Sequence, residues 1–249
     1  MLAKKIVVIG AGSLAFTPRF VADLILSDEM SGSTISFVDL DSERLELMTR
    51  LANKMIKAKK ANLEIESTTD RREVLKGADF VISTIAVGGI DAHNLDVEIS
   101  KKYGIYTSIG DTVGPQGFSR ALRQIPATVD VCRDMESLCP NALFINEANP
   151  LSGICSAVHR ATKIKVIGLG SSRVREHLAQ LVAANPEQTE VVLTGINHLV
   201  WILAFRVKGE DAYPSLIKRL SQFGPVRPKL FEIYGIIPAI ADEHVAEFY

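Results

Sequence analysis

The feature that most constrains the fold is a glycine-rich turn directly behind a short apolar run. Ile6-Val7-Val8-Ile9 has the length and composition of a buried strand, and it leads into Gly10-Ala11-Gly12-Ser13-Leu14-Ala15. Helical periodicity follows from about Pro18 to Ser27. In a turn of the pattern Gly-x-Gly-x-x-Ala the first glycine allows the tight bend, and the second lets the backbone approach a pyrophosphate. The pattern therefore predicts a dinucleotide-binding turn, with the phosphates at the N-terminus of the helix.

An acidic residue behind the next predicted strand, 35–38, supports this interpretation. Asp39 lies where a carboxylate can bind the hydroxyls of a ribose. It favours NAD over NADP because it would repel a 2′-phosphate, although neighbouring Arg44 keeps NADP open. The alternative is that the glycines only shape a turn, and that the stretch 84–89 is an ordinary glycine-rich loop. The predicted cofactor-binding residues are Gly10, Gly12, Ser13, Leu14, Asp39 and, at the end of a later strand, Val87.

Short apolar runs alternate with helical segments, which is typical of βαβ units around a parallel sheet. Further strands are predicted around Ile65 and at 79–84, 142–146 and 165–168, with helices at 42–58 and 118–138. We expect a kink or a break in the long helix at Pro126. Beyond it, 190–195 and 201–207 are predicted strands, antiparallel and outside the first sheet. The predicted fold class is α/β: a Rossmann-type doubly wound parallel sheet at 1–168, binding NAD, followed at 169–249 by the start of a mixed α/β substrate and metal domain.

The composition excludes several classes of function. Lys and Arg number 28 against 29 Asp and Glu, so the chain has no net basic field to attract nucleic acid or a membrane surface. No apolar run reaches the roughly 18 residues of a spanning helix. The N-terminus has no signal-peptide layout, and the three cysteines lack Cys-x-x-Cys spacing. We therefore expect a cytoplasmic protein whose partner is a small molecule.

Three polar clusters follow predicted strand ends. The segment 110–117 is too glycine-rich for a helix and carries Asp111, a predicted catalytic residue; alternatively Asp111 or Thr112 caps the long helix. Asn149 is the second predicted catalytic residue: Pro150 holds it in an extended conformation, where its amide could bind substrate hydroxyls or the nicotinamide ribose, or else secure its own loop. His198 ends the run Gly195-Ile196-Asn197-His198, and a single histidine beside a strand is more often structural than a ligand.

Taken together, these motifs resemble glycoside hydrolase family 4, the NAD- and divalent-metal-dependent glycosidases. That group includes 6-phospho-glucosidases, α-galactosidases and α-galacturonidases. The resemblance runs from Lys4 to Phe248 and includes the closing pattern Pro-x-x-x-Asp-x-His-x-x-Glu-Phe that begins at Pro238. It implies a Rossmann half and a mixed α/β half related to the lactate/malate dehydrogenase fold.

The resemblance implies a chemistry that differs from the usual two-carboxylate mechanism of glycosidases. NAD⁺ takes a hydride from C3 of the sugar, a base removes the acidified C2 proton, and the C1 substituent leaves by elimination. Water then adds, and the hydride returns. A divalent metal, typically Mn²⁺, polarises the C3 ketone.

Carried over to this sequence, the resemblance implies that His198 binds the metal and that Asn149 faces the substrate. The cysteine that normally completes the metal site falls on Gly170, and the residue after it is Ser171. Glycine has no ligating side chain, so we expect an incomplete metal site. Ser171 and Ser172 are weak replacements. The resemblance also implies that a tyrosine is the base that removes the C2 proton, and Tyr234 has no positional match to it.

Alternatives in other classes remain open. A 2-hydroxy-acid dehydrogenase would share the fold, but it needs an arginine clamp, which Ile90-Asp91-Ala92-His93 does not supply. A non-catalytic NAD-binding remnant is favoured by Gly170 and by the early end of the chain, since family members extend beyond the Glu-Phe motif. The substrate is expected to be a sugar or sugar phosphate. The oligomeric state stays open, with a homo-oligomer as one possibility.

Overall fold

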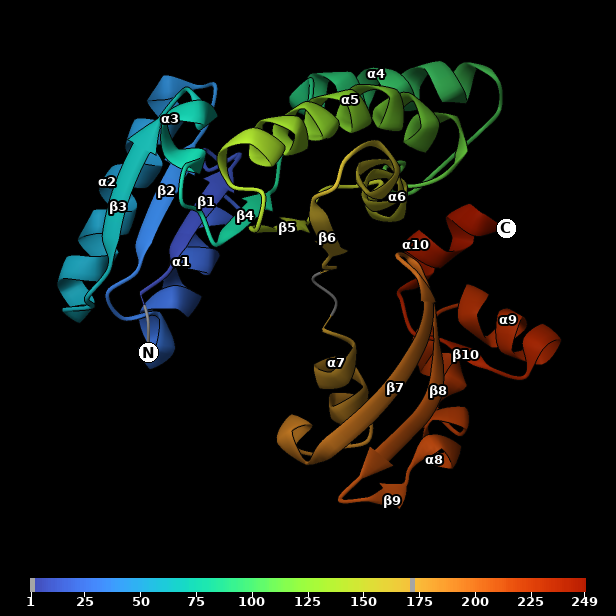
Figure 1. Cartoon of the computed structure of the whole chain (residues 1–249). Helices are drawn as coiled ribbons and strands as arrows, with labels where there is room; N and C mark the ends of the chain where they lie inside the picture. The colour runs from blue at the N-terminus through green and yellow to red at the C-terminus, as the bar shows by residue number, and fades with distance from the viewer. Residues whose placement is uncertain (1–2, 171–172) are drawn as a thin grey trace. The chain divides into compact units, whose positions relative to one another are not determined.

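Six parallel strands form the main sheet, in the order β3-β2-β1-β4-β5-β6 (Figure 1). The computed structural model describes residues 3–170 and 173–249 of the chain. This strand order is that of a dinucleotide-binding Rossmann sheet. The predicted α/β class, with its doubly wound parallel sheet and a separate antiparallel sheet, is confirmed. The strands are β1 (Lys5–Ile9), β2 (Thr34–Val38), β3 (Glu64–Thr68), β4 (Phe80–Ser83), β5 (Leu143–Asn146) and β6 (Lys165–Gly168).

Helices cover both faces of the sheet, which explains why its central strands are apolar almost without interruption. In β1, Ile6 and Val8 belong to one core cluster, which includes side chains of α1 and α2. Val7 and Ile9 belong to the opposite cluster, which includes side chains of α3, α5 and α6. The helices of this part are α1 (Thr17–Leu26), α2 (Ser42–Lys59), α3 (Arg71–Leu75), α5 (Gly114–Leu138) and α6 (Leu151–Ala161), with a 3₁₀ turn η1 (Asp28–Met30).

Helix α5 corrects one sequence expectation. The segment 110–117 was expected to be too glycine-rich for a helix, but α5 begins inside it, at Gly114. Gly114 has a φ of 69°, and Pro115 occupies the first turn, where a missing N–H costs nothing. The helix also continues through Pro126, so the chain does not break there.

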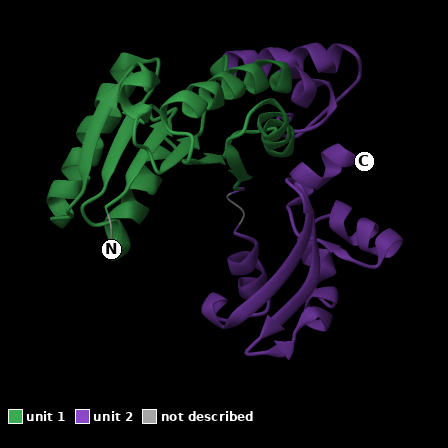
Figure 2. Ribbon diagram, viewed as in Figure 1, with its two compact units in different colours: residues 1–89, 120–169 green, residues 90–119, 170–249 purple. Residues whose placement is uncertain are grey.

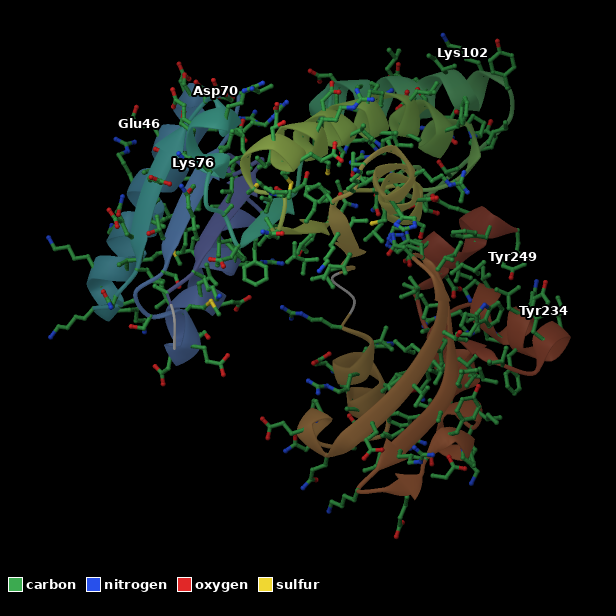
Figure 3. The ribbon with its side chains drawn as sticks, viewed as in Figure 1. Glu46, Asp70, Lys76, Lys102, Tyr234 and Tyr249 are labelled. Carbon is green, nitrogen blue, oxygen red and sulfur yellow. The ribbon has the colours of Figure 1, made fainter. Side chains whose placement is uncertain are left out.

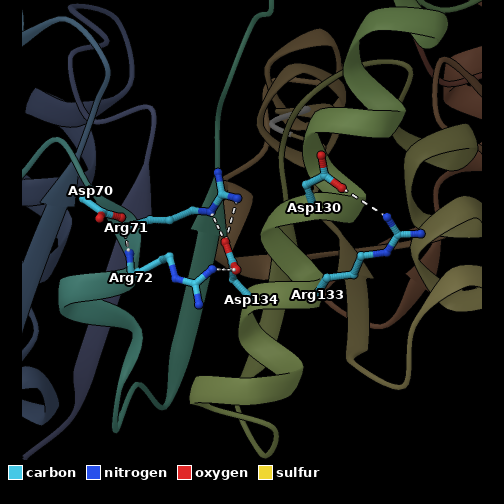
Figure 4. A network of polar contacts seen from close by, with 6 residues as sticks. All are labelled: Asp70, Arg71, Arg72, Asp130, Arg133 and Asp134. Carbon is cyan, nitrogen blue, oxygen red and sulfur yellow. Dashed lines mark hydrogen bonds and ion pairs between the residues drawn. The ribbon is translucent and has the colours of Figure 1, made fainter.

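A charged network joins α3 to α5 (Figure 4). Arg71 Nε donates to Asp134 Oδ2 at 2.8 Å, and Arg72 Nη1 lies 3.0 Å from Asp134 Oδ1. The Asp134 side chain is only 14% exposed, so these contacts are screened less than most surface ion pairs. Asp70 caps α3 by accepting from the backbone N–H of Arg72.

The second sheet is built on a long antiparallel hairpin. Strands β7 (Thr189–Ile196) and β8 (Leu199–Val207) pair along their length, β10 (Ile237–Pro238) pairs with β8, and β9 (Glu210–Asp211) extends the other end of β8. Phe205, Ile202 and Ile237 are fully buried in the core of this part. Its remaining elements are α7 (Val174–Leu181), η2 (Pro186–Gln188), α8 (Tyr213–Ile217), η3 (Leu220–Phe223), α9 (Val226–Tyr234), α10 (Asp242–Val245) and η4 (Ala246–Phe248).

The chain divides into two compact units, residues 1–89 with 120–169 and residues 90–119 with 170–249 (Figure 2). The second unit thus includes most of α4 (Gly89–Lys102), a helix that the sequence analysis did not predict. The proposed division into domains 1–168 and 169–249 stays a prediction. Within residues 3–170 and 173–249, no helix is long and apolar enough to cross a membrane.

Candidate functional site

The glycine-rich turn of the first unit folds back onto the end of β2. The backbone N–H groups of Gly10 and Ala11 both donate to the carbonyl of Val38, at 2.8 and 3.0 Å. The Thr17 hydroxyl, at the start of α1, donates to the carbonyl of Ala11 at 2.7 Å. These bonds fix the turn between the first strand and its helix, as the sequence pattern predicts.

Asp39 closes the same turn. Its Oδ2 accepts from the Gly12 N–H at 2.8 Å, and its Oδ1 accepts from the Asp41 N–H at 3.0 Å. A Cβ added at Gly12 would lie 2.8 Å from Asp39 Oδ2 and 3.0 Å from Arg44 Cβ, so a side chain at position 12 would displace this contact. The absent side chain at position 12 and the nearby acid fit a dinucleotide, and each carboxylate oxygen of Asp39 still has a lone pair for a ribose hydroxyl.

A buried glutamine on α5 holds the loop that follows β4. Val87, a predicted cofactor residue, donates its N–H to Gln124 Oε1 at 2.6 Å, and Gln124 Nε2 donates to the Ile85 carbonyl at 2.6 Å. Gln124 is fully buried. The sequence gives no sign of this role, because Gln124 shares a helix face with the polar residues Gln116 and Thr128, which are also buried, and a polar face is normally expected to meet solvent.

The loop after β5 carries Asn149. Asn146 is fully buried and binds the backbone of Ala148 through both ends of its amide. The carbonyl of Asn149 accepts from Arg120 Nε at 3.0 Å. Burial raises the pKa of Glu147, which lies between them in the sequence.

In the second unit, His198 lies in the two-residue turn between β7 and β8, with a positive φ of 67°. Gly195 supports this turn, because a Cβ there would overlap the carbonyl of Leu199. His198 Nδ1 lies 2.8 Å from Thr112 Oγ1 and 3.7 Å from Asp111 Oδ1. The Thr112 hydroxyl donates to Asp111 Oδ1 at 2.8 Å. Two predicted site residues, Asp111 and His198, are thus brought together from segments far apart in the sequence.

The closing motif of the chain supports this cluster. The His244 ring lies on the His198 ring, with centroids 4.0 Å apart. Glu247 Oε1 accepts from the N–H groups of Ile109 and Gly110, at 2.6 and 2.8 Å. Burial, and next the proximity of His244, lower the pKa of His198, while Asp111 and Glu247 act in the opposite direction.

His244 and Glu247 appear in the sequence analysis only as part of a pattern, with no role assigned. Tyr234 packs against Trp201, with ring centroids 5.3 Å apart, and lies 6.1 Å from Tyr249 (Figure 3). This aromatic cluster gives Tyr234 a packing role.

The described residues do not fit a complete divalent-metal site. Across residues 3–170 and 173–249, no group of three or more His, Cys, Asp or Glu side chains could hold a metal ion. Gly170, where the resemblance implies a cysteine, lies beside the His198 turn, since a Cβ there would be 3.0 Å from Asn197 Oδ1. Ser171 and Ser172 lie outside the described residues.

The site residues therefore form two sets, each within one unit. Gly10, Gly12 and Asp39 meet in the first unit, which also contains Ser13, Leu14, Val87 and Asn149. Leu14 is 66% exposed, available to a ligand. Asp111 and His198 meet in the second unit.

Comparison with known proteins covers both units. Residues 5–183 match the model of family 4 glycosyl hydrolases, and residues 193–249 match the C-terminal domain model of that family. An α-galactosidase of Bacillus subtilis is 34% identical over 255 residues, covering 99% of this chain and 59% of the relative. An α-galacturonidase of Thermoanaerobacter italicus is 32% identical over 273 residues, covering 98% and 59%. The chain thus spans little more than half the length of these relatives.

Solved structures agree with these matches. A 6-phospho-β-glucosidase from Thermotoga maritima, solved with manganese, NAD⁺ and glucose-6-phosphate, has a TM-score of 0.84 at 25% identity, covering 99% of this chain and 59% of that one. A malate dehydrogenase of Cryptosporidium parvum has a TM-score of 0.62 at 17% identity, covering 99% and 67%, which shows a shared fold alone. From the match of both units, the chain belongs to glycosyl hydrolase family 4.

Proposed function

We propose that the chain carries out NAD-dependent hydrolysis of a glycoside or a 6-phospho-glycoside. The observation that carries this proposal is the turn at Gly12 closed on Asp39, in a chain of this family. In this proposal the pyrophosphate lies at the glycine-rich turn ahead of α1, where Gly12 has no side chain, and Asp39 supplies a carboxylate for a ribose. NAD⁺, when bound, would supply reversible hydride transfer at C3 of the sugar, so that the net reaction is hydrolysis.

The roles proposed for this chain's other residues follow from their positions. The Asn149 amide, beyond β5, would bind hydroxyls of the sugar or of the nicotinamide ribose. Asp111 and His198 would orient the sugar and accept or hold protons in the second unit. Because the described residues do not form a metal site, no step is assigned to a metal.

The names of the relatives suggest the substrate class. They include α-galactosidases, α-galacturonidases and a 6-phospho-β-glucosidase. We propose a hexose, a hexuronic acid or a hexose 6-phosphate on the glycone side of the bond.

Calorimetric titration with NAD⁺ tests the cofactor part. We expect binding by the native chain and a loss of at least about tenfold in Gly12→Ala, equivalent to 1.4 kcal/mol. Gly153→Ala is the matched control, because a Cβ at Gly153, inside α6, would make only an ordinary contact with Pro150. No binding by the native chain at millimolar NAD⁺ would overturn the proposal.

A panel of nitrophenyl glycosides, with and without a 6-phosphate, tests the reaction. It is run with NAD⁺ and Mn²⁺, with and without a thiol reductant. Turnover that requires NAD⁺ would support the proposal. NAD⁺ binding without any turnover would favour the second candidate, a non-catalytic NAD-binding protein. The observation that supports this candidate is the incomplete set of metal-binding side chains among the described residues.

A further inference from the structure

The hydrogen bonds around Thr112 define which nitrogen of His198 carries a proton. Thr112 Oγ1 lies 2.8 Å from Asp111 Oδ1 on one side and 2.8 Å from His198 Nδ1 on the other. A threonine hydroxyl has one proton to donate, and an ionised carboxylate can only accept. The Thr112 proton is therefore directed to Asp111, and Thr112 Oγ1 is left as the acceptor for His198.

We propose that Asp111 and Thr112 act as positioning residues that fix His198 in the Nδ1–H tautomer, with the lone pair on Nε2. The distance of 3.7 Å between His198 Nδ1 and Asp111 Oδ1 agrees with this polarity, because an N–H there points toward negative charge. The opposite tautomer would place two acceptors, Thr112 Oγ1 and His198 Nδ1, against each other or force Thr112 away from Asp111.

The surroundings hold the three side chains in place. The backbone of Thr112 packs directly against Gly117: a Cβ at that glycine would lie 2.6 Å from the Thr112 carbonyl oxygen. Glu247 binds the backbone immediately before Asp111, and His244 lies on the His198 ring. The His198 side chain is 15% exposed and that of Asp111 18%, so water competes weakly for these bonds.

The consequence of this tautomer is that the Nε2 lone pair of His198 is available as a proton or electrophile acceptor. A neutral imidazole that donates from Nδ1 to a carboxylate-linked oxygen presents its Nε2 lone pair to a proton or an electrophile. The use of that lone pair in glycoside hydrolysis rests on the proposed function. The tautomer itself does not, because it is a property of the protein without substrate.

Long-range ¹H–¹⁵N correlation of the imidazole nitrogens tests the proposal on the full chain. Spectra are recorded at about pH 8.5, two units above the ordinary pKa of histidine, so that the rings are neutral. The His198 signals are assigned by their loss in His198→Gln. We expect a pyrrole-type shift for Nδ1 and a pyridine-type shift for Nε2.

Variants at Thr112 test its part in the arrangement. Thr112→Val removes the hydroxyl at nearly constant shape and should shift His198 toward the Nε2–H tautomer, whereas Thr112→Ser should keep the native pattern. Thr194→Val, an exposed position of β7 in the same unit, is the matched control and should change nothing. A pyridine-type Nδ1 in the native protein, or a His198 left unchanged when Thr112→Val is combined with Asp111→Asn, would overturn the proposal. NAD⁺ titration of the same samples reports separately on the proposed function.

Discussion

At the scale of single residues, Asp39 uses both carboxylate oxygens on backbone N–H groups. Asp39→Asn should weaken NAD⁺ binding about ten- to a hundredfold, since hydrogen bonds to a charged group contribute about 1.5–3 kcal/mol. It should also reduce discrimination against NADP⁺, because the repulsion of a 2′-phosphate is removed while Arg44 stays nearby. Titrations with both nucleotides measure this. Asp23→Asn, which removes an exposed charge from α1 in the same unit, should leave both affinities unchanged.

Gly170 provides a second test at this scale. We expect weak Mn²⁺ binding by the native chain and an increase of about tenfold or more in Gly170→Cys, a gain of 1.4 kcal/mol or more. The reason is that a thiolate would be added beside the turn that carries His198. Gly170→Ala adds the same Cβ without sulfur and should not bind the metal better. Tight Mn²⁺ binding by the native chain would show that Gly170 is not a missing ligand.

Glu147 predicts a dependence of stability on pH. Because burial raises its pKa in the folded protein, the folded state binds this proton more tightly than the unfolded state. Its contribution to stability is greatest below the ordinary value of 4.5 and declines as the pH rises through the raised pKa. Glu147→Gln should therefore gain stability relative to the native protein across that window. Urea unfolding between about pH 4 and pH 7 measures this; the exposed Glu29→Gln should show no such trend.

At the scale of elements, the short helix α10 is fastened to α9 by a buried ion pair. Arg227 Nε lies 3.0 Å from Asp242 Oδ1, with side chains 8% and 17% exposed, and Asp242 Oδ2 accepts from the Val226 N–H. Asp242→Asn should lower the free energy of unfolding by about 3–5 kcal/mol, because the Arg227 charge stays buried without its partner. The exposed pair of Arg206 and Glu190 offers the comparison, and Glu190→Gln should cost less than about 1 kcal/mol. Equal losses in urea unfolding would contradict this argument.

Helix α4 shows why one element escaped prediction. Two of its buried residues, Asp96 and Ser100, are polar. By contrast, Leu95 and Ile99 within the helix and Tyr103 directly after it are exposed. A helix whose covered side is polar inverts the pattern from which amphipathic helices are recognised. Asp96 accepts from the Ser119 hydroxyl at 2.7 Å, and that partner is visible only in three dimensions.

At the scale of the whole molecule, the turn at Gly12 and the His198 cluster belong to different units. Because the polar contacts of His198 among the described residues are to Thr112 and Asp111 and none is to the turn at Gly12, His198→Gln should leave NAD⁺ affinity within about twofold of the native value while glycoside turnover falls. Gly12→Ala should lower both. Calorimetry and a glycoside assay on the same preparations measure the two effects. A large loss of NAD⁺ affinity in His198→Gln would show that the second unit takes part in holding the cofactor.

The main sheet and the glycine-rich turn were predictable because their signals are local. The apolar run Ile6–Ile9 contributes side chains to the hydrophobic cores on both faces of the sheet. Gly12 and Asp39, which bind each other, lie close in sequence to the ends of the strands that position them. The start of α5 was predicted wrongly, since glycines count against a helix until the turn that Gly114 and Pro115 make is seen.

The sequence by itself determined the α/β fold, the glycine-rich turn and the family, because periodicity and short motifs record the burial and backbone conformation of neighbouring residues. Tertiary structure alone decided which distant side chains meet. It placed His198 against Thr112 and Asp111, and Glu247 against the backbone N–H of Ile109. It also bound the side chain of Gln124 to the backbone N–H of Val87. Hydrogen bonds of this kind join segments 37 to 138 residues apart, and no local pattern encodes such a partner.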